Sequence, residues 1–396
     1  MKRHGNGKCL KLLLAAVIVF ALAPATALAE ETVVSADEVA QALAKGEPGV
    51  EKTIRIAVRA DEDAEQLVVR MHADEILAIQ GDHGRNLVVY DTPFGELAFI
   101  PGWDLEALSE EFGVPAEAIR FEVTITKPDG EQLEQIRQAA EAQGLALLAQ
   151  PMAAVTMELR ANGELLADEG FPGYLTQWLP ADPTIDWESS AAMFYIPDTE
   201  EFRFVPATSS VRDGRQMLTV MTCKCGHYVL VKNEKTFSDA TGDSYRAALN
   251  RLAARGVIQG TGGGLFQPDR LLTRAELAAM VVRFFGAVEE GSAELAAEAF
   301  DDVNADDWYA GYVGSLYRAG LLEGGTFHPN GNVTAEEIYN VLYSDPVIQF
   351  LFSFLDGPIQ TGGSRVTRAE AALIFDQLLQ AYELSIERAQ QRSLQG

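Results

Sequence analysis

The feature that most limits the fold of this chain is an internal repeat in its last two fifths. A unit of this kind cannot cover its own apolar face, so we expect three units to pack together, the third one degenerate. The expected units span about 237–286, 299–344 and 345–382. The first contains Phe-x-Asp at 237–239, Gly-x-Ile-x-Gly at 256–260, Phe-x-Pro at 266–268 and Thr-Arg-Ala-Glu at 273–276; related elements recur in the same order in the second unit, and the third keeps Thr-Arg-Ala-Glu at 367–370.

Each unit has the pattern of two amphipathic helices joined by a tight loop. Tyr245, Ala248, Leu249 and Leu252 follow helical spacing and predict one buried helix face. Gly256 stands where a left-handed helix C-cap is needed. The pairs Thr273–Glu276 and Thr367–Glu370 have the spacing of a capping box at the start of the next helix. The pattern therefore predicts an all-α helical repeat bundle over residues 236–396.

On these repeated elements, residues 237–380 resemble the S-layer homology (SLH) family of bacterial surface proteins. The resemblance implies three repeats in a pseudo-threefold helical arrangement that binds secondary cell-wall polysaccharide, often at pyruvylated sugar ends. By resemblance, the polysaccharide-binding residues are Thr273, Arg274, Glu276, Thr367, Arg368 and Glu370, and the residues that hold the repeat structure are Gly256, Gly260, Trp308 and Gly320.

The arginine of Thr-Arg-Ala-Glu suits an anionic ligand. A guanidinium can hold a carboxylate by two parallel hydrogen bonds, and free backbone N–H groups in a helix's first turn add to the attraction. The second repeat has Ala335 at this position, so we expect at most two competent sites. The third repeat is shortened, because 33 residues separate Thr334 from Thr367 against 61 between Thr273 and Thr334. Its first helix is expected at 346–355.

The first 29 residues have the pattern of a secretion signal peptide. Four basic residues precede a short apolar run at 12–22, and Ala27-Leu28-Ala29 follows as a typical cleavage site. This predicts a secreted protein at the cell surface or cell wall, with no membrane span after cleavage. The segment holds four of the 31 basic residues and none of the 58 acidic ones, so the remaining chain is strongly acidic. Such a charge disfavours binding to nucleic acid.

Two further regions lie between the signal and the repeats. Residues 30–150 alternate between helical and strand patterns and predict a mixed α/β domain. Helices are expected at 35–45, from the cap Asp104 through Phe112, and at 131–143. Residues 151–235 contain short strand patterns separated by turn residues and predict a β-rich module. The run from Tyr195 through His227 to Val231, which leads directly into the repeats, resembles the β-module that often precedes SLH repeats. The predicted fold class is multidomain α+β.

Other chemistry-bearing groups have weaker patterns. Cys223, Cys225 and His227 could ligate zinc, but a structural site needs four ligands. Asp301-Asp302 and Asp306-Asp307 lack the order of a calcium loop and suit helix entry and capping. His72 and His83, with nearby aspartates, fit a solvated surface better than a metal or base site. We therefore predict no metal, no cofactor and no catalytic residue.

The resulting hypothesis is a non-enzymatic surface protein held on the wall by its repeats, with secondary cell-wall polysaccharide as partner. One alternative is a cell-wall or polysaccharide hydrolase with its active site in residues 30–150. Another is an adhesion or assembly protein whose N-terminal region binds itself or another surface protein.

Overall fold

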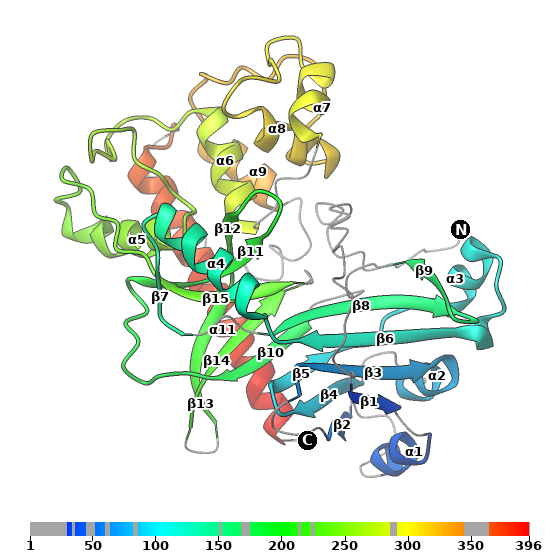
Figure 1. The fold of residues 1–396 in the computed structure, drawn as a ribbon. Helices are drawn as coiled ribbons and strands as arrows, with labels where there is room; N and C mark the ends of the chain where they lie inside the picture. The colour runs from blue at the N-terminus through cyan, green and yellow to red at the C-terminus, as the bar shows by residue number, and fades with distance from the viewer. Residues whose placement is uncertain are drawn as a thin grey trace.

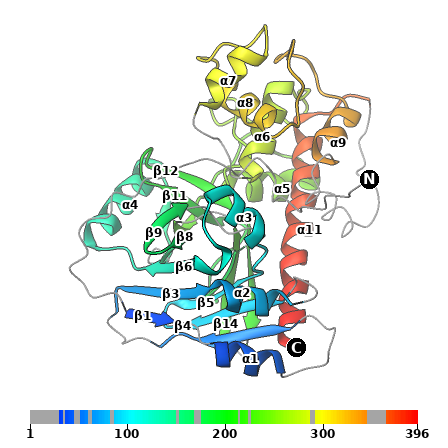
Figure 2. The same ribbon diagram turned by 90° about the vertical axis from the view of Figure 1, so that its right-hand side faces the viewer.

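The computed structural model shows a sheet-rich body and a helical region above it, with one long helix running beside both (Figures 1 and 2). The signal segment, Cys223, Cys225, His83 and the expected helix at 346–355 lie outside the described residues. The structure describes residues 30–33, 36–44, 52–59, 64–81, 86–149, 153–167, 175–212, 215–222, 226–285, 291–343 and 364–395.

The first sheet is five-stranded, with β1 parallel to β3 and the other neighbours antiparallel. Its side chains alternate between a buried and a half-exposed face, as in β6, where Phe121, Val123 and Ile125 are buried. In order across the sheet, its strands are β1 (Glu30–Val33), β3 (Gln66–His72), β6 (Ile119–Thr126), β8 (Ala154–Ala161) and β9 (Glu164–Ala167).

The second sheet packs on the buried face of the first. Phe121 and Met157 of the first sheet share one apolar core with Tyr90 and Phe99 of the second. In order, the strands of the second sheet are β13 (Ala207–Arg212), β14 (Arg215–Thr222), β10 (Leu175–Pro180), β5 (Gly95–Phe99), β4 (Leu87–Thr92) and β2 (Thr53–Ala57).

The third sheet is antiparallel and lies between a helix and the second sheet. Helix α4 (Gly130–Ala142) packs Ile136 on one face, and Leu218 and Val220 of β14 pack on the other. In order, its strands are β12 (Glu201–Val205), β11 (Ser190–Ile196), β15 (His227–Lys232) and β7 (Ala146–Leu147).

The remaining helices of this body are short. Asp104 accepts the Ala107 N–H at 3.0 Å and begins α3 (Leu105–Phe112), as its sequence predicts. Helix α1 (Ala36–Ala44) also lies where expected. The sequence pattern did not predict α2 (Ala73–Gln80), which follows β3 without a loop, nor the single turn η2 (Ala116–Ala118).

The helical region contains the repeats. The first repeat supplies α5 (Asp243–Ala254) and α6 (Arg274–Phe285), and the second supplies α8 (Ala310–Arg318) and α9 (Ala335–Tyr343). Helix α7 (Ser292–Ala299) lies between them, and the third repeat begins the long α11 (Arg368–Gln395). Among the described residues, no helix is both long enough and apolar enough to cross a membrane.

Helix α11 is joined to the end of α5 by partly buried ion pairs. Arg251 donates to Asp376 at 2.8 Å, and Arg255 lies 3.3 Å from Glu383. Arg255 also donates to the Trp187 carbonyl in the loop before β11. Helix α11 is thereby connected to the first repeat, and the first repeat to the sheet-rich body.

The predicted fold class is wrong in two respects. Strands before residue 150 pair with strands after it in all three sheets: β6 with β8, β5 with β10 and β7 with β15. There is thus no mixed α/β part with sheets separate from those of a β-rich part. The local pattern identifies a strand but does not specify its distant partner.

The C-terminal region also differs from the predicted all-α bundle. β-bridges connect its repeats at Leu271–Thr367, Thr273–Asn332 and Thr334–Arg365. Phe204 of β12 belongs to the apolar core of the repeats and contacts Phe284 at a ring-centroid distance of 6.4 Å. Helix periodicity could reveal neither contact, because both join segments far apart in sequence.

Candidate functional site

The three repeats meet in a closed cycle of backbone hydrogen bonds. Leu272 donates to Val366 at 2.9 Å, Val366 donates to Val333 at 3.0 Å, and Val333 donates to Leu272 at 2.9 Å. All three side chains are fully buried. The cycle places the residue before each Thr-x-x-Glu motif at one common point, so three helix starts surround it. This is a pseudo-threefold arrangement of the repeats.

Each helix that leaves this point begins with a capping box. The threonine Oγ1 accepts the glutamate N–H, and the glutamate Oε2 accepts the threonine N–H, at 2.8–3.2 Å in every case. The two predicted boxes are therefore formed, and the second repeat has one as well. The pairs are Thr273–Glu276, Thr334–Glu337 and Thr367–Glu370.

Arg274 extends from the first repeat to the second. Its Nε donates to the Phe327 carbonyl at 2.7 Å, its Nη1 pairs with Glu337, and its guanidinium carbon lies 5.3 Å from the Phe327 ring centroid. The Arg274 side chain remains 30% exposed. It lines a pocket of about 170 Å³ whose walls are mainly apolar. The pocket residues are Arg274, Leu277, Ala278, Leu316, Leu322, Phe327, Val333, Glu337, Asn340 and Val341.

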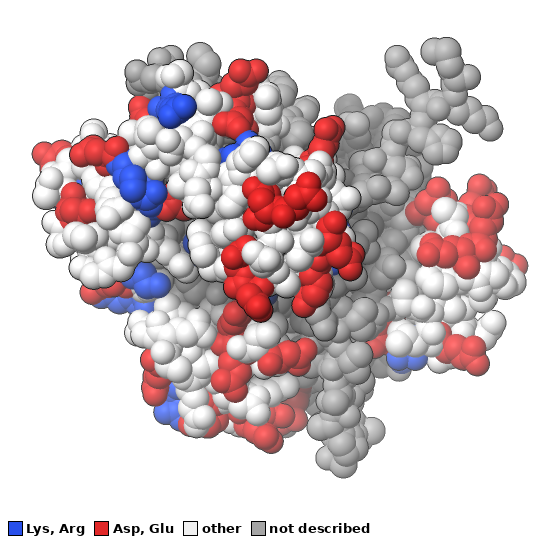
Figure 3. All heavy atoms as spheres, turned by 90° about the horizontal axis from the view of Figure 1, so that it is seen from above, with Lys and Arg blue, Asp and Glu red and all other residues white. Residues whose placement is uncertain are grey.

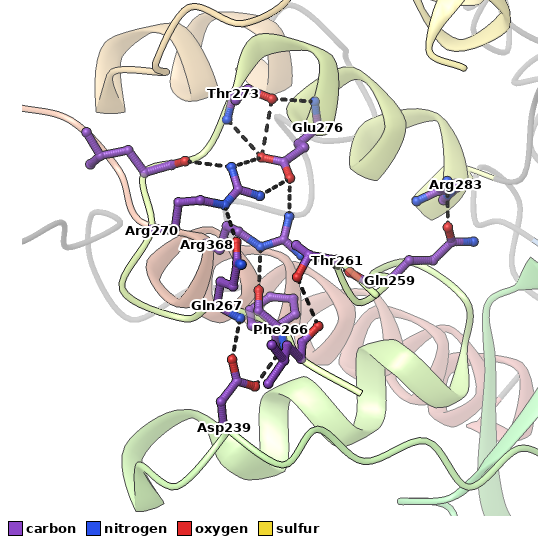
Figure 4. A network of polar contacts seen from close by, with 12 residues as sticks. Asp239, Gln259, Thr261, Phe266, Gln267, Arg270, Thr273, Glu276, Arg283 and Arg368 are labelled. Carbon is purple, nitrogen blue, oxygen red and sulfur yellow. Dashed lines mark hydrogen bonds and ion pairs between the residues drawn. The ribbon is translucent and has the colours of Figure 1, made fainter. Parts of the chain in front are cut away.

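Arg368 makes the corresponding contacts from the third repeat to the first (Figure 4). Its Nε donates to the Phe266 carbonyl at 2.7 Å and its Nη2 to the Gln259 carbonyl at 2.8 Å, while Nη1 pairs with Glu276. Arg270 binds the same Glu276 carboxylate. Burial is the main cause that lowers the pKa of Arg368.

An aspartate of each Phe-x-Asp element fixes the Phe-x-Pro loop that the arginine contacts. Asp239 accepts the N–H groups of Phe266 and Gln267 at 2.8 and 2.7 Å. Asp302 accepts those of Phe327 and His328, both at 2.7 Å. Partial burial acts to raise the pKa of each aspartate, but these backbone hydrogen bonds outweigh it and lower the pKa.

These loops contain unusual backbone. Gln267 and His328 have φ values of 58° and 57°, in the left-handed region that non-glycine residues rarely adopt. The aspartate carboxylates hold them there. The sequence suggested that Asp302 caps a helix. Its carboxylate instead binds the backbone of a loop. No cluster of three or more potential metal ligands occurs in the described ranges.

The residues expected to hold the repeat structure have separate roles. Gly256 and Gly320 have φ values of 71° and 72° and follow the ends of α5 and α8. The left-handed conformation was predicted for Gly256, and Gly320 repeats it. A Cβ at Gly260 would lie 2.7 Å from the Leu265 carbonyl, so this position requires glycine. Trp308 is 58% exposed and contacts Tyr309 and Tyr312 edge-on.

Sequence reasoning missed several residues of the two arginine environments. Glu337 occupies the same motif position as Glu276, so the repeat alignment was a usable signal for it. Gln259 acts through its backbone carbonyl, which no side-chain pattern reports. Arg270 corresponds to Gly331 in the second repeat and therefore carries no repeat signal.

Comparison with known proteins agrees with this architecture. The model of the S-layer homology domain matches residues 236–278 and 299–337. The chain is 28% identical over 178 residues, 43% of its length, to an amylopullulanase of Thermoanaerobacterium thermosulfurigenes, and 34% identical over 110 residues, 27% of its length, to endo-1,4-beta-xylanase A of Thermoanaerobacterium saccharolyticum. It is 29% identical over 111 residues, also 27% of its length, to the S-layer protein sap of Bacillus anthracis.

The chain spans only 9% of the length of each of the first two relatives and 13% of the third. With the repeat geometry, these matches identify a protein that contains S-layer homology domains. These findings place it at the cell surface and cell wall, and S-layer homology domains support anchoring there.

Proposed function

We propose that the repeats hold this chain on the wall by binding secondary cell-wall polysaccharide non-covalently, at anionic sugar ends such as pyruvate ketals. The observation that carries the proposal is the position of Arg274. It stands in the first turn of α6, beside a pocket between two repeats, and its side chain is accessible to solvent.

The chemistry of the pocket fits such a ligand. The Arg274 guanidinium attracts a carboxylate and can bind both of its oxygens. The backbone N–H groups at the start of α6 are not free as the sequence suggested, because Arg274 and Ala275 donate to the Gly331 and Pro329 carbonyls. The apolar walls, including Leu277, Leu316 and Val341, can accept the methyl group of a ketal. Glu337, an acceptor already paired with Arg274, would have to share the guanidinium with the ligand. This competition favours a strong, fixed anion over a neutral sugar.

The proposal assigns no catalytic step to this chain. The names of the amylopullulanase and the xylanase give no reason to propose catalysis for this chain, because the matches span 9% of each relative's length. The hydrolase alternative would be supported by release of sugars from wall fragments that depends on one carboxylate in residues 30–150.

The acidic surface seen in Figure 3, where red side chains outnumber blue ones, suits an exposed envelope protein.

Sedimentation with cell-wall sacculi tests the anchor. The purified chain is expected to pellet with intact sacculi and to stay in solution with sacculi stripped of secondary polymer by acid. Arg274→Ala should weaken the affinity for intact sacculi by about tenfold, the loss expected for one charge-assisted contact. Arg137→Ala removes one cation from an exposed site on α4 and serves as the control for net charge. Equal binding to stripped and intact sacculi would refute the proposal.

A further inference from the structure

The two arginines that the repeat equates lie in different surroundings. The Arg368 side chain is 7% exposed, whereas that of Arg274 is 30% exposed. Their carboxylate partners differ in the same direction, with Glu276 at 16% and Glu337 at 35%. A ligand in solvent can therefore reach one guanidinium far more easily than the other.

The hydrogen-bonding capacity of the two groups differs as well. All three nitrogens of Arg368 are engaged, by the Phe266 carbonyl, the Gln259 carbonyl and Glu276. Arg274 uses Nε and Nη1 in the equivalent way, but its Nη2 has no hydrogen-bond partner within the described part of the chain. Arg274 thus keeps donors for a ligand, while Arg368 keeps fewer.

The reason lies in residues outside the shared motif. Arg270 adds a second guanidinium to Glu276, and its counterpart in the second repeat is Gly331, which has no side chain. The Glu276 carboxylate is consequently held by two arginines and by Thr273 (Figure 4). A ligand anion at Arg368 would have to displace this carboxylate and leave it half-buried with one cation fewer, which is costly.

We propose that the two arginines have diverged in role: Arg274 contacts the wall polymer, while Arg368 with Glu276 and Arg270 forms a structural lock between the third and first repeats. Since Ala335 replaces the arginine of the second repeat, each chain then has one arginine-lined binding groove. This inference rests on the proposed function for its binding half only. The lock is a claim about folding and stands on its own contacts.

Paired lysine variants of the full chain test the divergence, because lysine keeps the charge but cannot make the multiple directed hydrogen bonds of arginine. Arg274→Lys should weaken binding to intact sacculi by about tenfold and leave the urea midpoint of unfolding nearly unchanged. Arg368→Lys should leave binding of the folded protein unchanged and lower the urea midpoint. Arg270→Gly, which makes the first repeat resemble the second, should lower the midpoint and leave binding at Arg274 intact.

The results separate the two claims. If Arg368→Lys, folded by circular dichroism, loses binding as strongly as Arg274→Lys, the divergence is wrong. It is also wrong if both lysine variants shift the urea midpoint equally. If the unaltered chain fails to bind sacculi, the proposed function fails, while a midpoint lowered only by the Arg368 and Arg270 changes still supports the lock.

Discussion

At the scale of single residues, the repeats depend on carboxylates that bind backbone rather than on apolar contacts alone. Asp302 satisfies two N–H groups of a loop whose His328 has left-handed backbone. That loop supplies the carbonyl and the ring that Arg274 contacts. A side chain that does not itself line the pocket thus determines the geometry of one of the pocket's walls.

Replacing Asp302 with alanine should therefore destabilise the protein by about 1–3 kcal/mol, the usual cost of leaving such donors unsatisfied. Urea unfolding followed by circular dichroism measures the change. The neighbouring Asp301→Ala is the matched control, because Asp301 is exposed and its backbone N–H, which alanine keeps, donates to the Gly325 carbonyl. An equal loss in both variants would contradict a specific role for the Asp302 carboxylate.

The same carboxylates predict a pH dependence of stability. The pKa values of Asp239 and Asp302 are lowered from 3.8, and that of Glu276 from 4.5. In all three groups burial acts to raise the pKa and is outweighed, by backbone hydrogen bonds in the aspartates and by Arg270 and Arg368 in Glu276. A lowered pKa in the folded state means that its stabilisation is present above the unfolded value and is lost as the pH falls.

The urea midpoint should therefore decrease as the pH is lowered from about 5 to about 3. Asp302→Ala should make the fall shallower, since one contributing group is gone. Glu383 acts in the opposite sense: burial raises its pKa from 4.5, so its contribution is lost as the pH rises. A midpoint that stays constant or increases as the pH is lowered would show that the three groups with lowered pKa values do not dominate.

At the scale of elements, a four-residue motif, Thr-x-x-Glu, determines where three helices of the repeats begin. A threonine and a glutamate satisfy each other's backbone N–H groups wherever the Thr-x-x-Glu spacing occurs, whatever packs against the helix. Helix α2 shows the limit of such signals, because it begins at Ala73, directly after the last residue of β3, with no loop between the two elements.

Thr334→Val should test this local contribution. Valine keeps the shape of threonine but removes the Oγ1 that accepts the Glu337 N–H at 3.1 Å, so the expected cost is about 1 kcal/mol. The unfolding midpoint measures it, and Thr326→Val, at an exposed position of the same repeat, is the control. No difference between the two variants would mean that tertiary contacts alone position α9.

At the scale of the whole molecule, the sheets join parts of the chain that the sequence pattern separates. β5, β6 and β7 all find partners beyond residue 150. Helix α11 then connects the repeats to this body, as both ribbon views show. The anchor and the sheet-rich body are therefore expected to be mechanically connected rather than joined by a loose linker.

A fragment of residues 30–150 should accordingly fail to fold. It would expose the edges of β5 and β6 that pair with β10 and β8 in the full chain, and open edges of this kind promote aggregation. The full chain should show a cooperative urea transition and the fragment none, with light scattering as the check for aggregates. A cooperative transition in the fragment would show that these long-range pairings are dispensable.

The sequence by itself determined the repeat, the starts and ends of several helices and the class of the anchoring region. It did so because caps, C-terminal glycines and helical periodicity act over a few residues. Gly256, Gly320 and the threonine–glutamate pairs needed no knowledge of distant contacts. The same local rules located α1, α3 and α4 in the sheet-rich body.

Only the tertiary structure decided which strands share a sheet and which arginine remains open to a ligand. Arg274 and Arg368 have the same motif, yet their carboxylate partners lie 63 and 92 residues away. The burial and the ion pairing of an arginine depend on neighbours that are distant in sequence. One additional side chain, Arg270, is enough to make the two arginines differ. A motif specifies which chemical group is present, whereas the packing around it determines how much of that group a ligand can reach.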